Sequence, residues 1–359
     1  MKATDAHRVG IIRDDRFLEH KTGLIHPEHP NRLKAIHAML DRDFASGLIH
    51  IQADLATMDE LELVHTPTYI KKVMKTAERE FTHLAPDTPA SNMTYLAAWL
   101  AVGGCLKALE ALMTGRCDSV FAFVRPPGHH AVEDRALGFC IFNNLGIAAR
   151  KALQGFSLGR ILIVDWDIHH GNGLQQLFYE DPRVLYFSSH YLSSYPATGD
   201  WEETGQGDGL GYTINVPIPK NMEDDDIVHC YREILGPVVR RYRPELILVA
   251  AGFDAHGADP MGHARLTERA FGRLTRLIMD LREENGRPPV LLALEGGYDL
   301  PALAASVHEV LDALLGKAYP GEIQETTTPA GADMAARAAR VHAEFGIWTD
   351  AAVAEVGAS

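Results

Sequence analysis

Two acids and a histidine at alternate positions of one short stretch are the residues of this chain best suited to chemistry. Asp165, Asp167 and His169 follow an apolar run at 161–164, which predicts a buried strand that ends in polar side chains. In an extended segment, alternate residues point to the same side. Two buried carboxylates and an imidazole are costly unless a cation compensates them, and a divalent metal ion is the usual one.

Three further predicted strands also end in polar residues. They lead to Asp254, to the tandem His129 and His130, and to Tyr298 after two glycines. Because the carboxyl ends of parallel strands share one edge of a sheet, these side chains can converge with the first group. Paired histidines suit proton transfer, and a tyrosine hydroxyl suits polarisation of a carbonyl.

The convergent set predicts a metal-dependent enzyme. Asp167, His169 and Asp254 would supply two carboxylates and one imidazole, which leaves a coordination position open for water and substrate. Such an open site is typical of catalytic zinc rather than structural zinc. The sequence does not fix the native metal, because an oxygen-rich site also tolerates iron or cobalt.

Strands and helices alternate along the chain, which predicts a single-domain α/β fold with an open, doubly wound, mostly parallel sheet flanked by helices. The predicted strands span residues 7–12, 119–124, 160–164, 184–188, 246–251 and 290–294. The predicted helices span residues 32–41, 67–80, 94–113, 144–153, 173–180, 224–242, 267–284 and 301–315. We expect a catalytic domain at 1–318 and, at 319–359, a loop and a helical appendage packed on it.

Composition and charge narrow the class of protein. The 359 residues carry a net charge of −14, which disfavours binding to nucleic acid or anionic membranes and is compatible with a cationic substrate. The first residues lack an apolar signal segment, and we expect no run of transmembrane length. The four cysteines form no CxxC pair, which favours reduced, buried thiols in a cytoplasmic protein. A homo-oligomer is compatible with the sequence.

Seven motifs in order resemble the histone deacetylase and acetylpolyamine amidohydrolase family, which has an arginase-like α/β fold. Bacterial class II-type deacetylases are the most similar members. The motifs are HPEHPNR at 26–32, DTP at 87–89, RPPGHHA at 125–131, GFCIFNN at 138–144, DWDIHHGNG at 165–173, AGFDAHGADP at 251–260 and LEGGYDL at 294–300. The resemblance implies a zinc-dependent hydrolase that removes acetyl or other acyl groups from lysine ε-amino groups or similar primary amines and releases acetate.

The resemblance also assigns roles to matching residues. The zinc ligands would be Asp167, His169 and Asp254. The catalytic residues would be His129, His130, Asp165, Asn172 and Tyr298. Asp165 would orient His129. Asn172 stands where class I enzymes carry an acid, which should leave His130 less basic. His170 receives only a supporting role.

Substrate and potassium sites are implied in the same way. The substrate-binding residues would be Arg32, Asp87, Gly138, Phe139, Tyr195 and Met261. Phe139 and Tyr195 would be opposite walls of an acyl-lysine tunnel, with Asp87 at its rim and Arg32 near an inner channel for acetate. One potassium ion would be bound at Asp165, Asp167, His169, Ser188 and Ser189, and another at Phe178, Asp181, Val184 and Tyr212. Several of these positions would contribute backbone carbonyls.

Three other functions stay open. Acetylpolyamine hydrolysis would need an acidic gate at the tunnel mouth, and Met261 stands where one such acid can lie, which favours an acyl-lysine substrate. A binuclear manganese hydrolase of the arginase type would want acidic ligands where His129 and His130 stand. A non-catalytic acyl-lysine-binding module would not need the histidines and the tyrosine.

Overall fold

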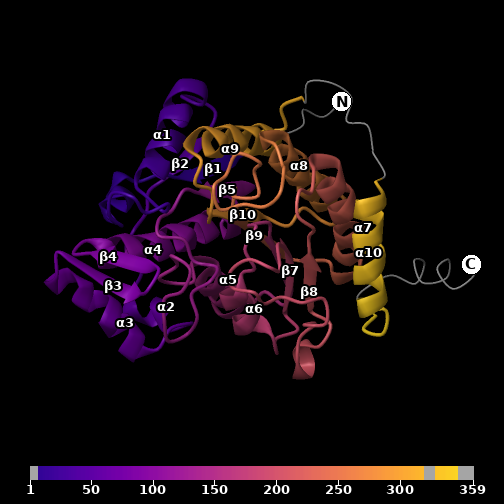
Figure 1. The fold of residues 1–359 in the computed structure, drawn as a ribbon, viewed down its shortest axis with the longest axis horizontal. Coiled ribbons are helices and arrows are strands. Elements are labelled where there is room, and N and C mark those ends of the chain that lie inside the picture. Colours follow the sequence, from indigo (N-terminus) through magenta and orange to yellow (C-terminus); the bar gives the residue numbers. More distant parts are fainter. Residues whose placement is uncertain (1–6, 319–327, 347–359) are drawn as a thin grey trace, which may run out of the picture.

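One eight-stranded parallel sheet forms the centre of the molecule (Figure 1). The computed structural model describes residues 7–318 and 328–346. The strands of the sheet are β1 Val9–Ile12, β2 Ile49–Ile51, β5 Ser119–Ala122, β6 Ile161–Asp165, β7 Val184–His190, β8 Thr213–Pro217, β9 Leu246–Ala251 and β10 Val290–Leu294. Their spatial order is β2-β1-β5-β10-β9-β6-β7-β8. The predicted α/β fold class is therefore confirmed.

Helices cover both faces of the sheet (Figure 1). One layer holds α1 Asn31–Asp43, α7 Asp224–Tyr242, α8 Glu268–Glu284 and α9 Leu300–Leu314, and the other holds α4 Thr94–Met113, α5 Asn144–Gly155 and α6 Asn172–Phe178. The short helices α2 Met58–Leu61 and α3 Pro67–Met74 lie beside α4 and α5. The last described helix, α10 Pro329–His342, packs against α7. The rest of the predicted tail, 319–327 and 347–359, lies outside the described residues.

The register of the sheet brings four strand ends to one level. The aligned pairs near these ends are Ala122 with Ala293, Leu294 with Ala251, and Asp165 with Ala250. The neighbours β5, β10, β9 and β6 are buried along their whole length, which explains why they read as continuous apolar runs. The loops that follow them therefore start side by side at the same edge.

Some expected elements differ from those observed. The helix expected to run to residue 80 ends at Met74 and is followed by a short 3-10 helix, Lys75–Glu78. A two-stranded antiparallel hairpin, β3 Phe81–Ala85 and β4 Thr88–Ser91, was not predicted. Its strands are short, and β4 contains Pro89, so neither shows the apolar alternation from which strands are recognised.

The helix α4 corrects the expectation that no run reaches transmembrane length. An 18-residue window of this 20-residue helix has a mean hydropathy of 1.5, so the helix is long and apolar enough to cross a membrane by length and composition alone. In the structure, 78% of that 18-residue segment is buried inside the fold. There, α4 packs against β1, β5 and β10. All four cysteines are free and buried, as expected.

Candidate metal centre and active site

Two carboxylates and one imidazole meet at the shared edge of β6 and β9. Candidate ligand atoms of Asp167, His169 and Asp254 all lie within 4.8 Å of one another, and the three residues are buried. Nδ1 of His169 lies 3.1 Å from an oxygen of Asp167 and 3.0 Å from an oxygen of Asp254. Oxygen and nitrogen donors in this number suit a catalytic zinc ion, so the predicted ligands fit the metal.

Backbone groups fix the remaining oxygens of both acids. Gly296 N–H donates to Asp167 Oδ2 at 2.9 Å, and Ile168 N–H donates to Asp254 Oδ1 at 3.0 Å. Glycine is needed at two positions here, because a Cβ at Gly252 would lie 2.0 Å from Asp167 Oδ2 and one at Gly296 would lie 2.2 Å from Asp254 Oδ2. The carboxylates are therefore oriented before any ion binds.

The tandem histidines have different partners. His129 Nδ1 lies 3.1 Å from Asp165 Oδ2, whereas His130 Nδ1 donates to Asn172 Oδ1 at 2.8 Å. Asp165 also accepts a hydrogen bond from the Tyr186 hydroxyl at 3.1 Å. The two imidazole rings lie 4.0 Å apart. One histidine thus faces a carboxylate and the other a neutral amide.

These partners separate the pKa values of the pair. Burial disfavours the charged form of His129, but the carboxylates of Asp165 and Asp167 outweigh it and raise the pKa of His129 to about 10. Burial and the neighbouring charge of His129 hold the pKa of His130 well below its usual range. At neutral pH the first ring is charged, and the second is neutral with Nε2 free to accept a proton.

Glu295 is a functional candidate to which the sequence analysis gave no role. It is fully buried, and its Oε2 accepts hydrogen bonds from the backbone N–H groups of Gly128 and His129 at 2.7 and 3.1 Å. Burial raises the pKa of Glu295 to about 7. His129, Cys140 and Glu295 also form a second group with ligand atoms within 4.8 Å of one another. Glu295 directly follows β10, and this place at the end of a buried strand was the signal that the sequence offered for it.

Aromatic rings line the approach to the metal group. The Phe139 ring lies 5.9 Å from the Tyr298 ring, and the Tyr195 ring lies 5.0 Å from the His130 ring. Gly138 and Phe139 both have positive φ, at 52° and 67°, and a Cβ at Gly138 would lie 2.4 Å from His130. The glycine therefore allows the wall to approach the histidines closely.

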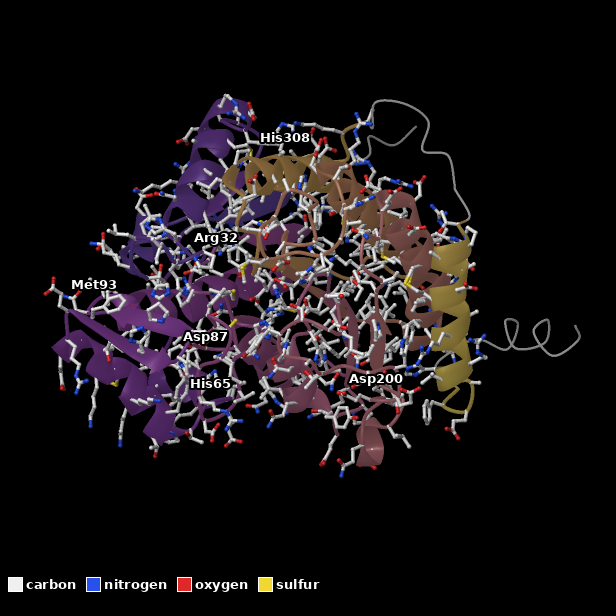
Figure 2. The ribbon with its side chains drawn as sticks, in the orientation of Figure 1. Arg32, His65, Asp87, Met93, Asp200 and His308 are labelled. Atoms are coloured by element: carbon white, nitrogen blue, oxygen red, sulfur yellow. The ribbon has the colours of Figure 1, made fainter. Side chains whose placement is uncertain are left out.

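Two other predicted substrate residues, Asp87 and Met261, lie in loops next to the aromatic walls and the Tyr298 turn. Asp87, in the turn of the β3–β4 hairpin (Figure 2), accepts a hydrogen bond from Gly138 N–H at 3.2 Å. The N–H groups of Met261 and Tyr298 both donate to the carboxylate of Asp259, at 2.9 and 2.6 Å. The loop of Met261 is thereby tied to the tyrosine.

A buried network of ion pairs supports the turn that carries Tyr298. Arg32 (Figure 2) donates through Nε to the Gly297 carbonyl at 2.6 Å, and its guanidinium lies 4.9 Å from the Tyr298 ring. Glu28 pairs with both Arg32 and Arg125, and none of the three is exposed. Glu28 and Arg125 were not predicted as site residues, although they stand in the motifs HPEHPNR and RPPGHHA.

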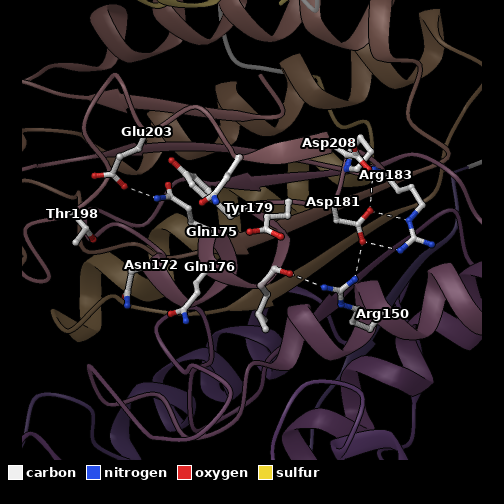
Figure 3. Close-up of a pocket in the computed structure, with 14 residues that line it drawn as sticks. Arg150, Asn172, Gln175, Gln176, Tyr179, Asp181, Arg183, Thr198, Glu203 and Asp208 are labelled. Atoms are coloured by element: carbon white, nitrogen blue, oxygen red, sulfur yellow. Dashed lines mark hydrogen bonds and ion pairs between the residues drawn. The ribbon is translucent and has the colours of Figure 1, made fainter. Parts of the chain in front are cut away.

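Three of the predicted potassium positions, Ser188, Ser189 and Asp181, make contacts within the protein. Ser188 pairs with Asp165 in the β6–β7 ladder, and Ser189 Oγ lies 2.6 Å from the Tyr231 hydroxyl. The carboxylate of Asp181 is engaged by Arg150 and Arg183, at 2.7 and 2.8 Å (Figure 3). Potassium binding stays a prediction.

His170 does not join the metal group. Its Nδ1 lies 2.8 Å from Thr198 Oγ1 and its Nε2 lies 2.9 Å from Gln175 Oε1. Gln175 in turn donates to Glu203 (Figure 3), beside a cavity of about 1100 Å³. His170 therefore anchors the loop that carries the Tyr195 wall.

Comparison with known proteins decides the family. Residues 26–314 match the Histone deacetylase domain. The chain belongs to the histone deacetylase family. The solved structure of the HDA15 HD domain superposes with a TM-score of 0.88 at 35% identity, covering 94% of this chain and 95% of that one. The resemblance and the fold inferred from the sequence are thus confirmed.

Three relatives that are similar in sequence to this chain differ from one another in length. Histone deacetylase 15 of Arabidopsis thaliana is 37% identical over 92% of this chain, and human polyamine deacetylase HDAC10 is 40% identical over 82%. The alignments span only 61% and 45% of those two proteins. An uncharacterized protein of Synechocystis is 37% identical over 86% of this chain and 99% of its own length.

Proposed function

We propose that this protein is a zinc-dependent deacetylase that hydrolyses the amide of an acetylated lysine side chain and releases acetate. One observation carries the proposal: Asp167, His169 and Asp254 are close enough to hold a metal ion, at the same sheet edge as a histidine pair whose Nδ1 atoms face a carboxylate and an amide. Membership of the histone deacetylase family supports this reaction class.

The metal would be held by the two carboxylates and by Nδ1 of the histidine. Zinc, when bound, would polarise the substrate carbonyl and make a water molecule more acidic. The chain's own residues orient the metal ligands, because backbone N–H donors fix the carboxylates of Asp167 and Asp254.

The protein side chains divide the proton transfers. His130 is neutral with Nε2 available, so it takes up the proton of the attacking water and later returns a proton to the leaving amine. The His129 ring, whose Nδ1 lies 3.1 Å from Asp165 Oδ2, packs 4.0 Å from the His130 ring and supports the proton transfers of that residue. The Tyr298 hydroxyl donates to the oxyanion that develops on the carbonyl. Arg32 holds the Tyr298 turn through the Gly297 carbonyl.

A lysine side chain suits the approach. The walls formed by Phe139 and Tyr195 offer apolar ring faces to an aliphatic stem. The net charge of −14 attracts the cationic segments in which acetylated lysines occur.

Hydrolysis of acetylated polyamines is the second candidate function. The relative HDAC10 is called a polyamine deacetylase and is 40% identical to this chain. Met261, in the loop tied to Tyr298 through Asp259, places a thioether where an acidic gate would need a carboxylate. We therefore place acetyl-lysine first.

Purified protein offered a series of substrates tests both candidates. The series contains acetyl, longer acyl and trifluoroacetyl lysine peptides and acetylspermidine, and the measured quantity is kcat/KM. Higher values on acetyl-lysine peptides support the proposal, whereas higher values on acetylspermidine support the second candidate. Metal counting in the same preparation addresses a binuclear centre, since the group of His129, Cys140 and Glu295 is close enough to hold a second ion.

A further inference from the structure

The loop between the 3-10 helix Asp15–Glu19 and α1 presents two aliphatic side chains to solvent. Leu24 is 97% exposed and Ile25 is 99% exposed, whereas no other exposed large apolar side chain of the described residues exceeds 48%. Single exposed apolar residues are common on protein surfaces. Two adjacent ones that are almost completely exposed indicate a contact with something other than residues 7–318 and 328–346 of this chain.

The tip of this loop is held out by buried residues on both sides. His20 and Thr22 precede it and Glu28 follows it, with exposures of 1%, 4% and 0%. His20 Nδ1 lies 2.9 Å from Thr94 Oγ1, and the Thr22 hydroxyl donates to the Glu28 carbonyl. The exposure of the tip is therefore built into the fold.

The tip continues directly into the wall of the substrate approach. His26, the next residue after Ile25, packs its ring 4.6 Å from the Phe139 ring, and its Nε2 lies 3.2 Å from the Asp87 carbonyl. On its other side, the tip faces Phe81 of β3 across a cavity of about 720 Å³ whose lining includes Leu24 and Phe81. One surface thus runs from Phe139 through His26 to the apolar tip.

We propose that Leu24, Ile25 and Phe81 bind the segment of a protein substrate that flanks the acetylated lysine. This inference rests on the proposed function and names its substrate class: lysines with a large apolar residue within about three positions, a reach of roughly 10 Å in an extended peptide. Peptides lie across this surface because their acetylated side chain enters beside Phe139. A second copy of this chain is disfavoured as the occupant, because both copies would carry a charge of −14.

Matched peptides test the inference. Two acetyl-lysine peptides are identical except for Leu or Ser two residues from the acetylated lysine, on either side, and a single blocked acetyl-lysine serves as the substrate without flanks. We expect kcat/KM to favour the Leu peptide by roughly fivefold or more, because part of an aliphatic side chain leaves water. The double variant Leu24→Ser/Ile25→Ser loses this preference and keeps its activity on the single residue.

Leu55→Ser is the matched control, since Leu55 is exposed on a different surface and the variant keeps the peptide preference. A wild-type protein that hydrolyses the single residue but treats both peptides alike overturns this inference alone. A protein that hydrolyses none of the substrates overturns the proposed function instead. A double variant that dissociates an oligomer in sedimentation and keeps the peptide preference assigns the tip to a second copy, which also overturns the inference.

Discussion

Removal of the Tyr298 hydroxyl tests the role of this residue without disturbing its surroundings. In Tyr298→Phe the ring still packs 5.9 Å from Phe139 and 4.9 Å from the Arg32 guanidinium. No hydrogen bond within residues 7–318 and 328–346 engages the hydroxyl, so the free energy of unfolding should change by less than about 1 kcal/mol. A donor to a developing oxyanion contributes about 2.7–4 kcal/mol, so kcat should fall by about 10²–10³.

The assay measures acetate release from an acetyl-lysine peptide at saturating substrate, together with urea unfolding of both proteins. Tyr195→Phe is the matched control, because it also removes one tyrosine hydroxyl and keeps the half-exposed ring that forms the opposite wall. Removal of the Tyr195 hydroxyl should change kcat less than roughly threefold. A Tyr298→Phe protein with almost full kcat would refute the assigned role. A large loss of stability in the variant would refute the packing argument.

Three further perturbations address the metal ligands, the histidine pair and the pH dependence of stability. Gly296→Ala places a Cβ 2.2 Å from one metal-binding carboxylate, so zinc affinity measured by chelator competition should fall roughly tenfold or more; unchanged affinity would contradict the geometry. Asn172→Asp puts a carboxylate beside His130, which should raise the pKa of His130 and move the acid limb of the pH profile of kcat/KM upward by roughly 1–3 pH units. An unmoved acid limb would exclude His130 as the base. Burial lowers the pKa of His65 to about 4, and its Nε2 accepts a hydrogen bond from Asn143 N–H at 2.9 Å, so the folded state resists protonation while the unfolded state takes up a proton below about pH 6.5. Because of His65, the free energy of unfolding should therefore fall by about 2 kcal/mol between pH 7 and pH 5. In urea titrations at the two pH values, His65→Gln should lose that part of the pH dependence. An equal pH dependence in both proteins would contradict the pKa shift.

Much of the framework could be predicted from local sequence signals. The strands β9 and β10 have the expected bounds because their apolar runs are buried on both faces and end at polar residues. The helices α4 and α7 also have the expected bounds. The hairpin β3–β4 was missed, since short strands with a proline carry no clear periodicity.

The candidate site was predictable in its ligands but not in its supports. Asp167, His169 and Asp254 follow apolar strands, and the parallel topology is enough to bring them together. The pairing of Glu28 with Arg125 joins residues 97 positions apart, and nothing local in the sequence indicates such a contact. The exposure of Leu24 likewise depends on which side of a loop faces solvent.

A zinc titration of metal-free protein tests the central claim most directly. Protein stripped with a chelator is supplied with increasing zinc, and acetate release from an acetyl-lysine peptide is measured at each point. We expect no activity without metal, a linear rise to a break at one zinc per chain, and no recovery in Asp254→Asn. Full activity of the stripped protein, or a break at two ions per chain, would contradict a single zinc centre at Asp167, His169 and Asp254.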